Sequence, residues 1–160
     1  MSVFSNTTPF IALSSVGLRD LLPTIFGEVY VVPSVAQECR EDGRTLVPDL
    51  TGLPWIKIQA PSNSAMQLPA LFELDRGERD TLLLAIQSPE ALVVMDEKLG
   101  RNTAEHLGLR VTGTLGVLAK ARVQGLIPSF TQVAQQMREQ GIYYQTDLAG
   151  KIAVRIGASN

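Results

Sequence analysis

Short apolar runs alternate with segments of helical periodicity through most of the chain. Apolar and β-branched runs predict strands at 2–5, 28–32, 55–58, 92–95 and 109–111. Apolar residues at helical spacing predict helices at about 10–17, 18–22, 35–41, 66–74, 78–87, 97–107 and 115–123. Strands that alternate with helices form a parallel sheet with helices on both faces. The pattern therefore predicts a three-layer α/β/α fold.

The last part of the chain is predicted to be helical. Ile127-Pro128-Ser129 leads into a helix at about 130–140, and a final helix is expected at 143–156, with Thr146 or Asp147 near its start. We expect one domain over residues 1–160, with a helical C-terminal extension from about residue 127. This extension packs on one side of the domain or takes part in dimer contacts.

Oxygen-bearing side chains follow several of the predicted strands. Two follow strands directly, Asn6 after the first and Asp96 after the fourth. The others near strand ends or helix starts are Glu38, Glu78, Thr112 and Thr114. In open parallel sheets, ligands bind outside the carboxyl ends of the strands. If the first and fourth strands are neighbours, Asn6 and Asp96 face each other, and Glu38 and Glu78 close the ring.

Gathered carboxylates indicate a cation or a shifted pKa. Two of them about 4 Å apart repel by about 4 kcal/mol at an effective dielectric of 20. Cys39 and His106 are the only residues of their types, which excludes a thiolate zinc site. Oxygen ligands suit a hard cation, Mg²⁺ or Mn²⁺, which can polarise a phosphodiester.

Charge and apolar content narrow the function classes. The net charge of −2 argues against a protein that coats nucleic acid, but it allows a local patch. Lys98, Arg101 and Arg110 lie just past the proposed edge and are candidates for RNA phosphates, or else a solvated face. No apolar run reaches the ~18 residues of a membrane span, and the start does not resemble a signal peptide. We expect a cytoplasmic protein with no membrane segment.

Five segments occur in an order that is familiar from a known family. They are 5–11 (SNTTPFI), 32–38 (VPSVAQE), 77–80 (GERD), 93–98 (VVMDEK) and 108–118 (GLRVTGTLGVL). Together they resemble the PIN superfamily, and within it an uncharacterised branch similar to VapC-type toxins. The resemblance covers the chain to about Gln140. It implies a parallel sheet in the order 3-2-1-4-5 and a divalent-metal ribonuclease, commonly a homodimer blocked by a small antitoxin protein.

The resemblance also assigns site residues by position. The family's four acidic positions fall on Asn6, Glu38, Glu78 and Asp96, and Thr112 or Thr114 lines the same edge with a hydroxyl. Asn6 departs from the usual Asp. An amide oxygen still binds Mg²⁺ but removes one negative charge, so metal binding should be weaker than is usual in the family.

Each of these residues also has a simpler interpretation. Asp96 can cap the following helix, Glu78 can be a surface residue in a first helical turn, and Asn6 can be a helix cap. Glu38 can be a solvated helix residue. The primary hypothesis is a metal-dependent endoribonuclease, the toxin of a toxin-antitoxin pair. The rival is a catalytically weak RNA- or protein-binding module. A small-molecule phosphohydrolase is a third interpretation, weakened by Lys98, which stands where a second acidic residue would be needed.

Overall fold

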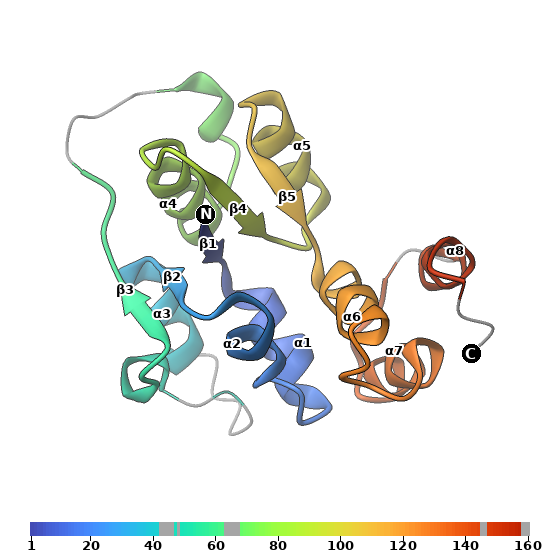
Figure 1. Cartoon of the computed structure of the whole chain (residues 1–160). Coiled ribbons are helices and arrows are strands. Elements are labelled where there is room, and N and C mark those ends of the chain that lie inside the picture. The colour runs from blue at the N-terminus through green and yellow to red at the C-terminus, as the bar shows by residue number, and fades with distance from the viewer. Residues whose placement is uncertain (42–46, 48, 63–67, 145–146, 158–160) are drawn as a thin grey trace.

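The computed structural model describes residues 1–41, 47, 49–62, 68–144 and 147–157 of the chain (Figure 1). Its centre is a five-stranded sheet in which every pairing is parallel. The strands are β1 (Ser2–Ser5), β2 (Val29–Val31), β3 (Ile56–Ile58), β4 (Ala91–Val94) and β5 (Arg110–Thr112). Their order is β3-β2-β1-β4-β5. The predicted α/β fold and strand order are confirmed.

The centre of the sheet is the pair β1 and β4. The two strands pair along their whole length, from Ser2 opposite Ala91 to Ser5 opposite Val94. Val93 and Val94 are fully buried, because a central parallel strand has both faces covered. The chain leaves β1 towards β2 and β3, then crosses back to β4, so the switch point of the sheet lies between β1 and β4.

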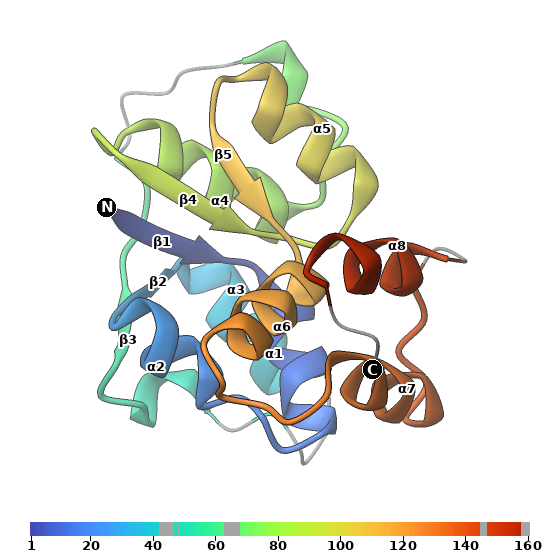
Figure 2. The same ribbon diagram turned by 45° about the vertical axis from the view of Figure 1, so that its right-hand side comes forward.

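The described residues form eight α-helices, and the last two lie to one side of the sheet (Figure 2). The eight helices are α1 (Thr7–Ser15), α2 (Leu21–Phe26), α3 (Pro33–Glu41), α4 (Arg76–Ile86), α5 (Lys98–His106), α6 (Thr114–Val123), α7 (Phe130–Glu139) and α8 (Leu148–Arg155). Two short 3₁₀ turns, η1 (Leu50–Gly52) and η2 (Pro69–Leu71), complete the elements. Helix α4 packs on β1 and β4, α5 on β5 and α2 on β2. None of the described helices combines the length and the apolar content that crossing a membrane requires.

Two helix predictions are wrong in their bounds. The helix expected to end at Pro23 instead begins at Leu21 and contains Pro23 in its first turn. Proline is tolerated there because the first N–H groups of a helix have no intrahelical acceptor. Of the helix expected at 66–74, only the turn Pro69–Leu71 appears, and residues 66–67 lie outside the described residues. The helix end expected at Asp42-Gly43 also lies outside them.

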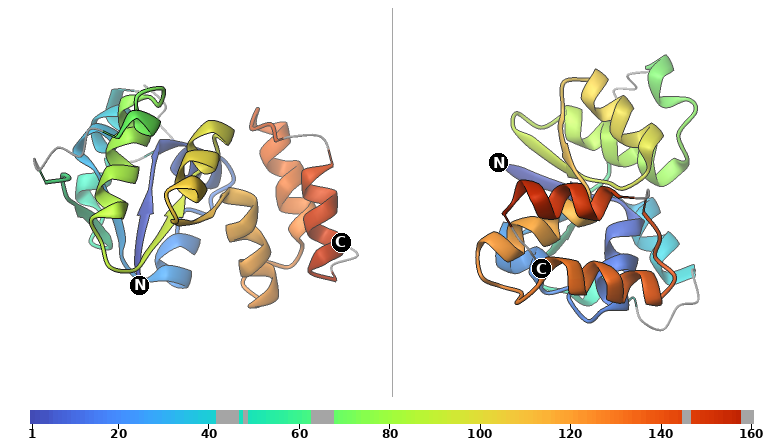
Figure 3. Two further views of the ribbon diagram at one scale, coloured as in Figure 1. Left: turned by 90° about the horizontal axis from the view of Figure 1, so that it is seen from above. Right: turned by 90° about the vertical axis from the view of Figure 1, so that its right-hand side faces the viewer.

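The C-terminal helices form a group at one side of the molecule. Helices α7 and α8 contact each other, and both contact α6 (Figure 3). The last helix begins at Leu148, five residues later than predicted, after Asp147 in a left-handed conformation. Tyr143 and Tyr144 therefore lie in the connection between α7 and α8 rather than in a helix. Thr146, the other predicted start, lies outside the described residues.

Candidate metal centre

Asn6 and Glu97 meet at the carboxyl edge of the sheet, between β1 and β4. The amide Nδ2 of Asn6 donates to both carboxylate oxygens of Glu97, at 3.0 and 3.1 Å. The hydroxyl of Thr8 donates to the same carboxylate at 3.2 Å. Asn6 directly follows β1, and Glu97 lies three residues after the end of β4. The contact therefore spans the switch point, where ligands bind in sheets of this kind.

The amide oxygen of Asn6 is buried without a hydrogen-bond partner among the described residues. Asn6 is only 4% exposed and occupies the N-cap position of α1, but its side chain makes no capping bond. The interpretation of Asn6 as a mere helix cap is therefore wrong. A buried acceptor without a donor costs free energy, about 1–3 kcal/mol. A cation is one ligand that satisfies such an oxygen.

Asp96 forms its hydrogen bonds with Thr114, at the start of α6, and with Tyr144. Its Oδ1 accepts the backbone N–H of Thr114 at 2.7 Å, and its Oδ2 accepts the Thr114 hydroxyl at 2.6 Å. The Tyr144 hydroxyl donates to Oδ2 at 3.4 Å. Asp96 thus anchors the start of α6, not of the helix that directly follows it. The side-chain partner of Asn6 is Glu97, the residue next to Asp96, while Asp96 bonds to Thr114 and Tyr144.

The position of β4 explains why the adjacent carboxylates Asp96 and Glu97 have different partners. Strand β4 lies between β1 and β5, and it ends at Val94. The chain beyond this end therefore lies within reach of both neighbours. Asp96 bonds to Thr114, after β5, and Glu97 bonds to Asn6, after β1. The sequence did contain the signal, a second carboxylate next to Asp96, but periodicity alone does not choose between the two.

Thr114 offers a test of the Asp96 anchor. Replacing Thr114 by Val keeps the buried volume but removes the hydroxyl that gives Asp96 its shortest hydrogen bond. The variant should lose about 1–3 kcal/mol of unfolding free energy, measured by urea denaturation. Thr112→Val is the matched control, since the Thr112 hydroxyl lies against Gly116 of α6 and is not among the partners of Asp96. Equal losses in the two variants would contradict the anchor.

Glu78 is buried at the start of α4 and is 8% exposed. Its Oε2 accepts the backbone N–H of Asp75 at 3.1 Å, while the Asp75 carboxylate accepts the N–H of Glu78, so the two residues form a capping box. Burial is the largest cause that raises the pKa of Glu78, to about 7. The Asp75 N–H acts in the opposite direction, and the nearby charges of Asp75 and Glu97 add to the rise. The simpler interpretation, in which Glu78 is a surface residue, is therefore wrong.

Glycines allow the close approach of neighbouring elements to Glu78 and Glu38. A Cβ on Gly100 of α5 would lie 3.3 Å from Oε1 of Glu78, and it would also clash with the sulfur of Met95. A Cβ on Gly77 would lie 3.0 Å from Oε2 of Glu38. Because neither glycine carries a side chain, α5 packs over Glu78, and α3 packs against the start of α4.

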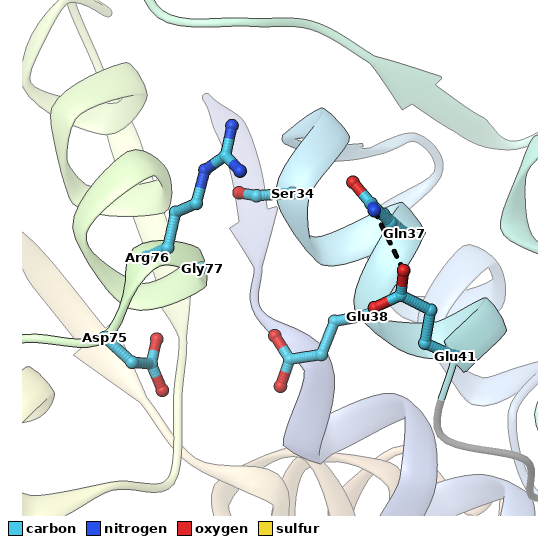
Figure 4. Close-up of a pocket in the computed structure, with 7 residues that line it drawn as sticks. All are labelled: Ser34, Gln37, Glu38, Glu41, Asp75, Arg76 and Gly77. Carbon is cyan, nitrogen blue, oxygen red and sulfur yellow. Dashed lines mark hydrogen bonds between the residues drawn. The ribbon is translucent and has the colours of Figure 1, made fainter.

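Glu38 lies at the rim, on the far side of Gly77. It is exposed, although the sequence placed it near the buried face of α3, because Val35, Ala36 and Cys39 fill that face. Figure 4 shows its carboxylate and that of Asp75 pointing into the same space. They line a pocket of about 320 Å³ with Ser34, Gln37, Glu41, Arg76 and Gly77. Glu38 thus belongs to the same edge as Glu78 but not to the contact of Asn6 with Glu97.

The three residues predicted to contact phosphates lie at different places in the fold. Lys98 is exposed at the start of α5, next to Glu97. The Arg101 guanidinium donates to the carbonyl of Met95 at 3.2 Å, so it supports the chain beside Asp96. Arg110 opens β5 opposite Leu92 and contacts the sulfur of Met1. It therefore lies at the amino edge of the sheet, and its placement near the metal edge is wrong.

The oxygen atoms at this edge of the sheet suit a hard cation by their chemistry. They comprise the orphaned Asn6 oxygen and the carboxylates of Glu97 and Glu78, whose charges interact. All are oxygen ligands of the kind that Mg²⁺ and Mn²⁺ prefer. No three Asp, Glu, His or Cys side chains among the described residues lie close enough together to hold a metal. Binding would therefore draw on the neutral amide, and the carboxylates would have to move closer.

A comparison with known protein families agrees with the observed fold. A family model described as PIN domain matches residues 2–158, which is nearly the whole chain. The chain belongs to the PIN domain family. No curated protein matches it. PIN domains are generally nucleases that use divalent metals.

Proposed function

We propose that this PIN domain is a divalent-metal-dependent endoribonuclease that cleaves RNA phosphodiester bonds. The observation that carries the proposal is the contact of Asn6 with Glu97 across the switch point, with the Asn6 oxygen buried and unpartnered. The oxygens of Asn6 and Glu97 are of the kind that a hard cation prefers, and they lie at the edge where parallel sheets bind ligands. Membership of the PIN family supports nuclease chemistry in general.

The proposed ligands are Asn6, Glu78 and Glu97, with Glu38 and Asp96 at the two flanks. When bound, Mg²⁺ or Mn²⁺ supplies charge neutralisation at a phosphodiester and acidifies a water molecule. Thr8 orients Glu97 through its hydroxyl, and Thr114 orients Asp96. Glu78, whose pKa burial raises to about 7, would have to be deprotonated to hold the cation as a charged ligand. Lys98 is placed to contact a phosphate, and Thr112 and Thr114 line the neighbouring strand end.

The proposal extends to the biological setting. By resemblance to VapC-type toxins, this ribonuclease would act in the cytoplasm as the toxin of a toxin-antitoxin pair. It would form a homodimer and be blocked by a small antitoxin protein. A light-scattering mass of the purified protein, alone and with the product of a neighbouring reading frame, tests these partners directly.

Replacing Asn6 by Asp tests whether the site lacks one charge. The variant should bind Mn²⁺ about tenfold more tightly or better and cleave single-stranded RNA faster, because charge count sets affinity for hard cations. Isothermal titration with Mn²⁺ and a gel assay of RNA cleavage measure the two effects. Asn102→Asp, on the exposed face of α5, adds the same charge away from the ligands and should change neither.

A second candidate function is a catalytically weak RNA- or protein-binding module. One observation favours it. The Asn6 amide donates to both oxygens of Glu97, so this carboxylate has a hydrogen-bond partner without a metal. The same experiment separates the two functions. RNA binding by the wild-type protein, with no Mn²⁺ uptake or cleavage by either the wild type or Asn6→Asp, would establish the module and remove the nuclease.

A further inference from the structure

The connection between α7 and α8 passes the rim of the proposed site. Tyr144, in this connection, is half-buried and reaches Asp96 with its hydroxyl, at 3.4 Å from Oδ2. Burial, and then the charge of Asp96, raise the pKa of Tyr144, which therefore stays protonated as a donor. Helix α8 then returns along α6 (Figure 2). The C-terminal segment is thus fastened to the carboxyl edge of the sheet.

Tyr143 is the neighbour of this anchored residue, and it is 73% exposed. Among the described residues, Phe72 is the only other exposed aromatic side chain. Consecutive Cα atoms are about 3.8 Å apart, so the anchor keeps the Tyr143 backbone within about 15 Å of Asp96. The Tyr143 backbone therefore lies within two or three nucleotide lengths of the carboxyl edge, and its ring is open to solvent.

We propose that Tyr143 is a base-stacking residue for single-stranded RNA, held at the rim of the site by Tyr144. The inference rests on the proposed ribonuclease function and names how that function would hold its substrate. Unpaired RNA bases stack on aromatic side chains, and the contact tolerates any base. The net charge of −2 gives this protein little general attraction to phosphates, so affinity for RNA must come in part from uncharged contacts. An exposed tyrosine beside the catalytic edge provides one.

Binding of a fluorescein-labelled 12-nucleotide oligouridine, followed by anisotropy, tests the inference. Tyr143→Ala should raise the Kd about 5- to 150-fold, the range that loss of one stacked base implies. Tyr143→Trp should keep the affinity and Tyr143→Leu should not, because stacking needs an aromatic face. Tyr144→Phe should weaken binding less than Tyr143→Ala, since it loosens the anchor and leaves the stacking ring. Phe72→Ala is the matched control and should bind as the wild type does.

The kinetics of RNA cleavage provide a second measurement of the role of Tyr143. Tyr143→Ala should raise KM for RNA and leave kcat and the Mn²⁺ affinity unchanged, because Tyr143 touches neither the metal ligands nor the reacting bond. If Tyr143→Ala leaves the RNA affinity unchanged, or changes the oligomeric state instead, the stacking inference is overturned and the proposed function still stands. A wild-type protein that neither binds nor cleaves RNA removes the proposed function, and this inference with it.

Discussion

Glu97→Gln is expected to lower RNA cleavage by at least about 100-fold and to weaken Mn²⁺ binding with it. A metal ion contributes several kcal/mol to phosphodiester cleavage, and about 3 kcal/mol corresponds to that factor. The substitution removes a charge but keeps an oxygen that can accept from Asn6, so the fold should persist. Cleavage rate at saturating Mn²⁺ and the titrated Mn²⁺ affinity measure the effect.

Two further variants make this result specific. Glu105→Gln, on the exposed face of the same helix, removes an equal charge outside the site and should leave cleavage unchanged. Asp96→Asn should reduce cleavage less than Glu97→Gln, because Asp96 already accepts three hydrogen bonds, whereas Glu97 accepts only from the side chains of Asn6 and Thr8 among the described residues. Full activity in Glu97→Gln, with loss confined to Asp96→Asn, would return the ligand role to Asp96.

Glu78→Gln is expected to stabilise the fold above pH 7 by up to about 3 kcal/mol. The folded-state pKa of Glu78 is about 7, against an ordinary value of 4.5. Between these values the folded protein binds more protons than the unfolded chain, so its stability falls as the pH rises through this window and levels off above it. Glutamine stays neutral and can still accept the Asp75 N–H, so the variant should lack that fall.

Urea denaturation at pH 5, 6, 7 and 8 measures this difference. The two proteins should differ least at pH 5 and most at pH 8, where the wild type carries a buried charge. Glu105→Gln again serves as the control, because an exposed carboxylate should not reproduce the slope. A constant difference between wild type and Glu78→Gln across the four pH values would show that burial does not control this carboxylate.

The strand pattern was readable because the core obeys simple rules. The run Leu92 to Val94 is apolar throughout, and a central parallel strand needs this because water reaches neither face. Gly108 marked the end of α5 correctly and has a positive φ of 80°. The start of α8 was missed because Tyr143 and Tyr144 fit a helical pattern. In the structure both residues precede α8. Tyr144 contacts Asp96, and Tyr143 is exposed.

The structure shows where the predicted site residues lie and which side chains they contact. Asn6 and Asp96 follow their strands closely and Glu78 lies in the first turn of α4, whereas Glu38 lies in the second turn of α3. Arg110 was misplaced because a residue that opens a parallel strand lies at the opposite edge from one that ends it. The resemblance to the PIN superfamily pointed to Asp96, whose hydrogen bonds instead go to Thr114 and Tyr144.

Residue types and their periodicity were thus enough for the parallel sheet, its covering helices and the oxygen-rich edge, since these follow from local propensity and from burial of apolar strands. Which of two adjacent carboxylates meets Asn6 depended on β4 lying between β1 and β5. The near-neutral pKa of Glu78 depended on α5 packing over it. The approach of Tyr144 to Asp96 depended on the return of the C-terminal segment. Side-chain direction and desolvation are set by neighbours distant along the chain, and only packing brings those neighbours together.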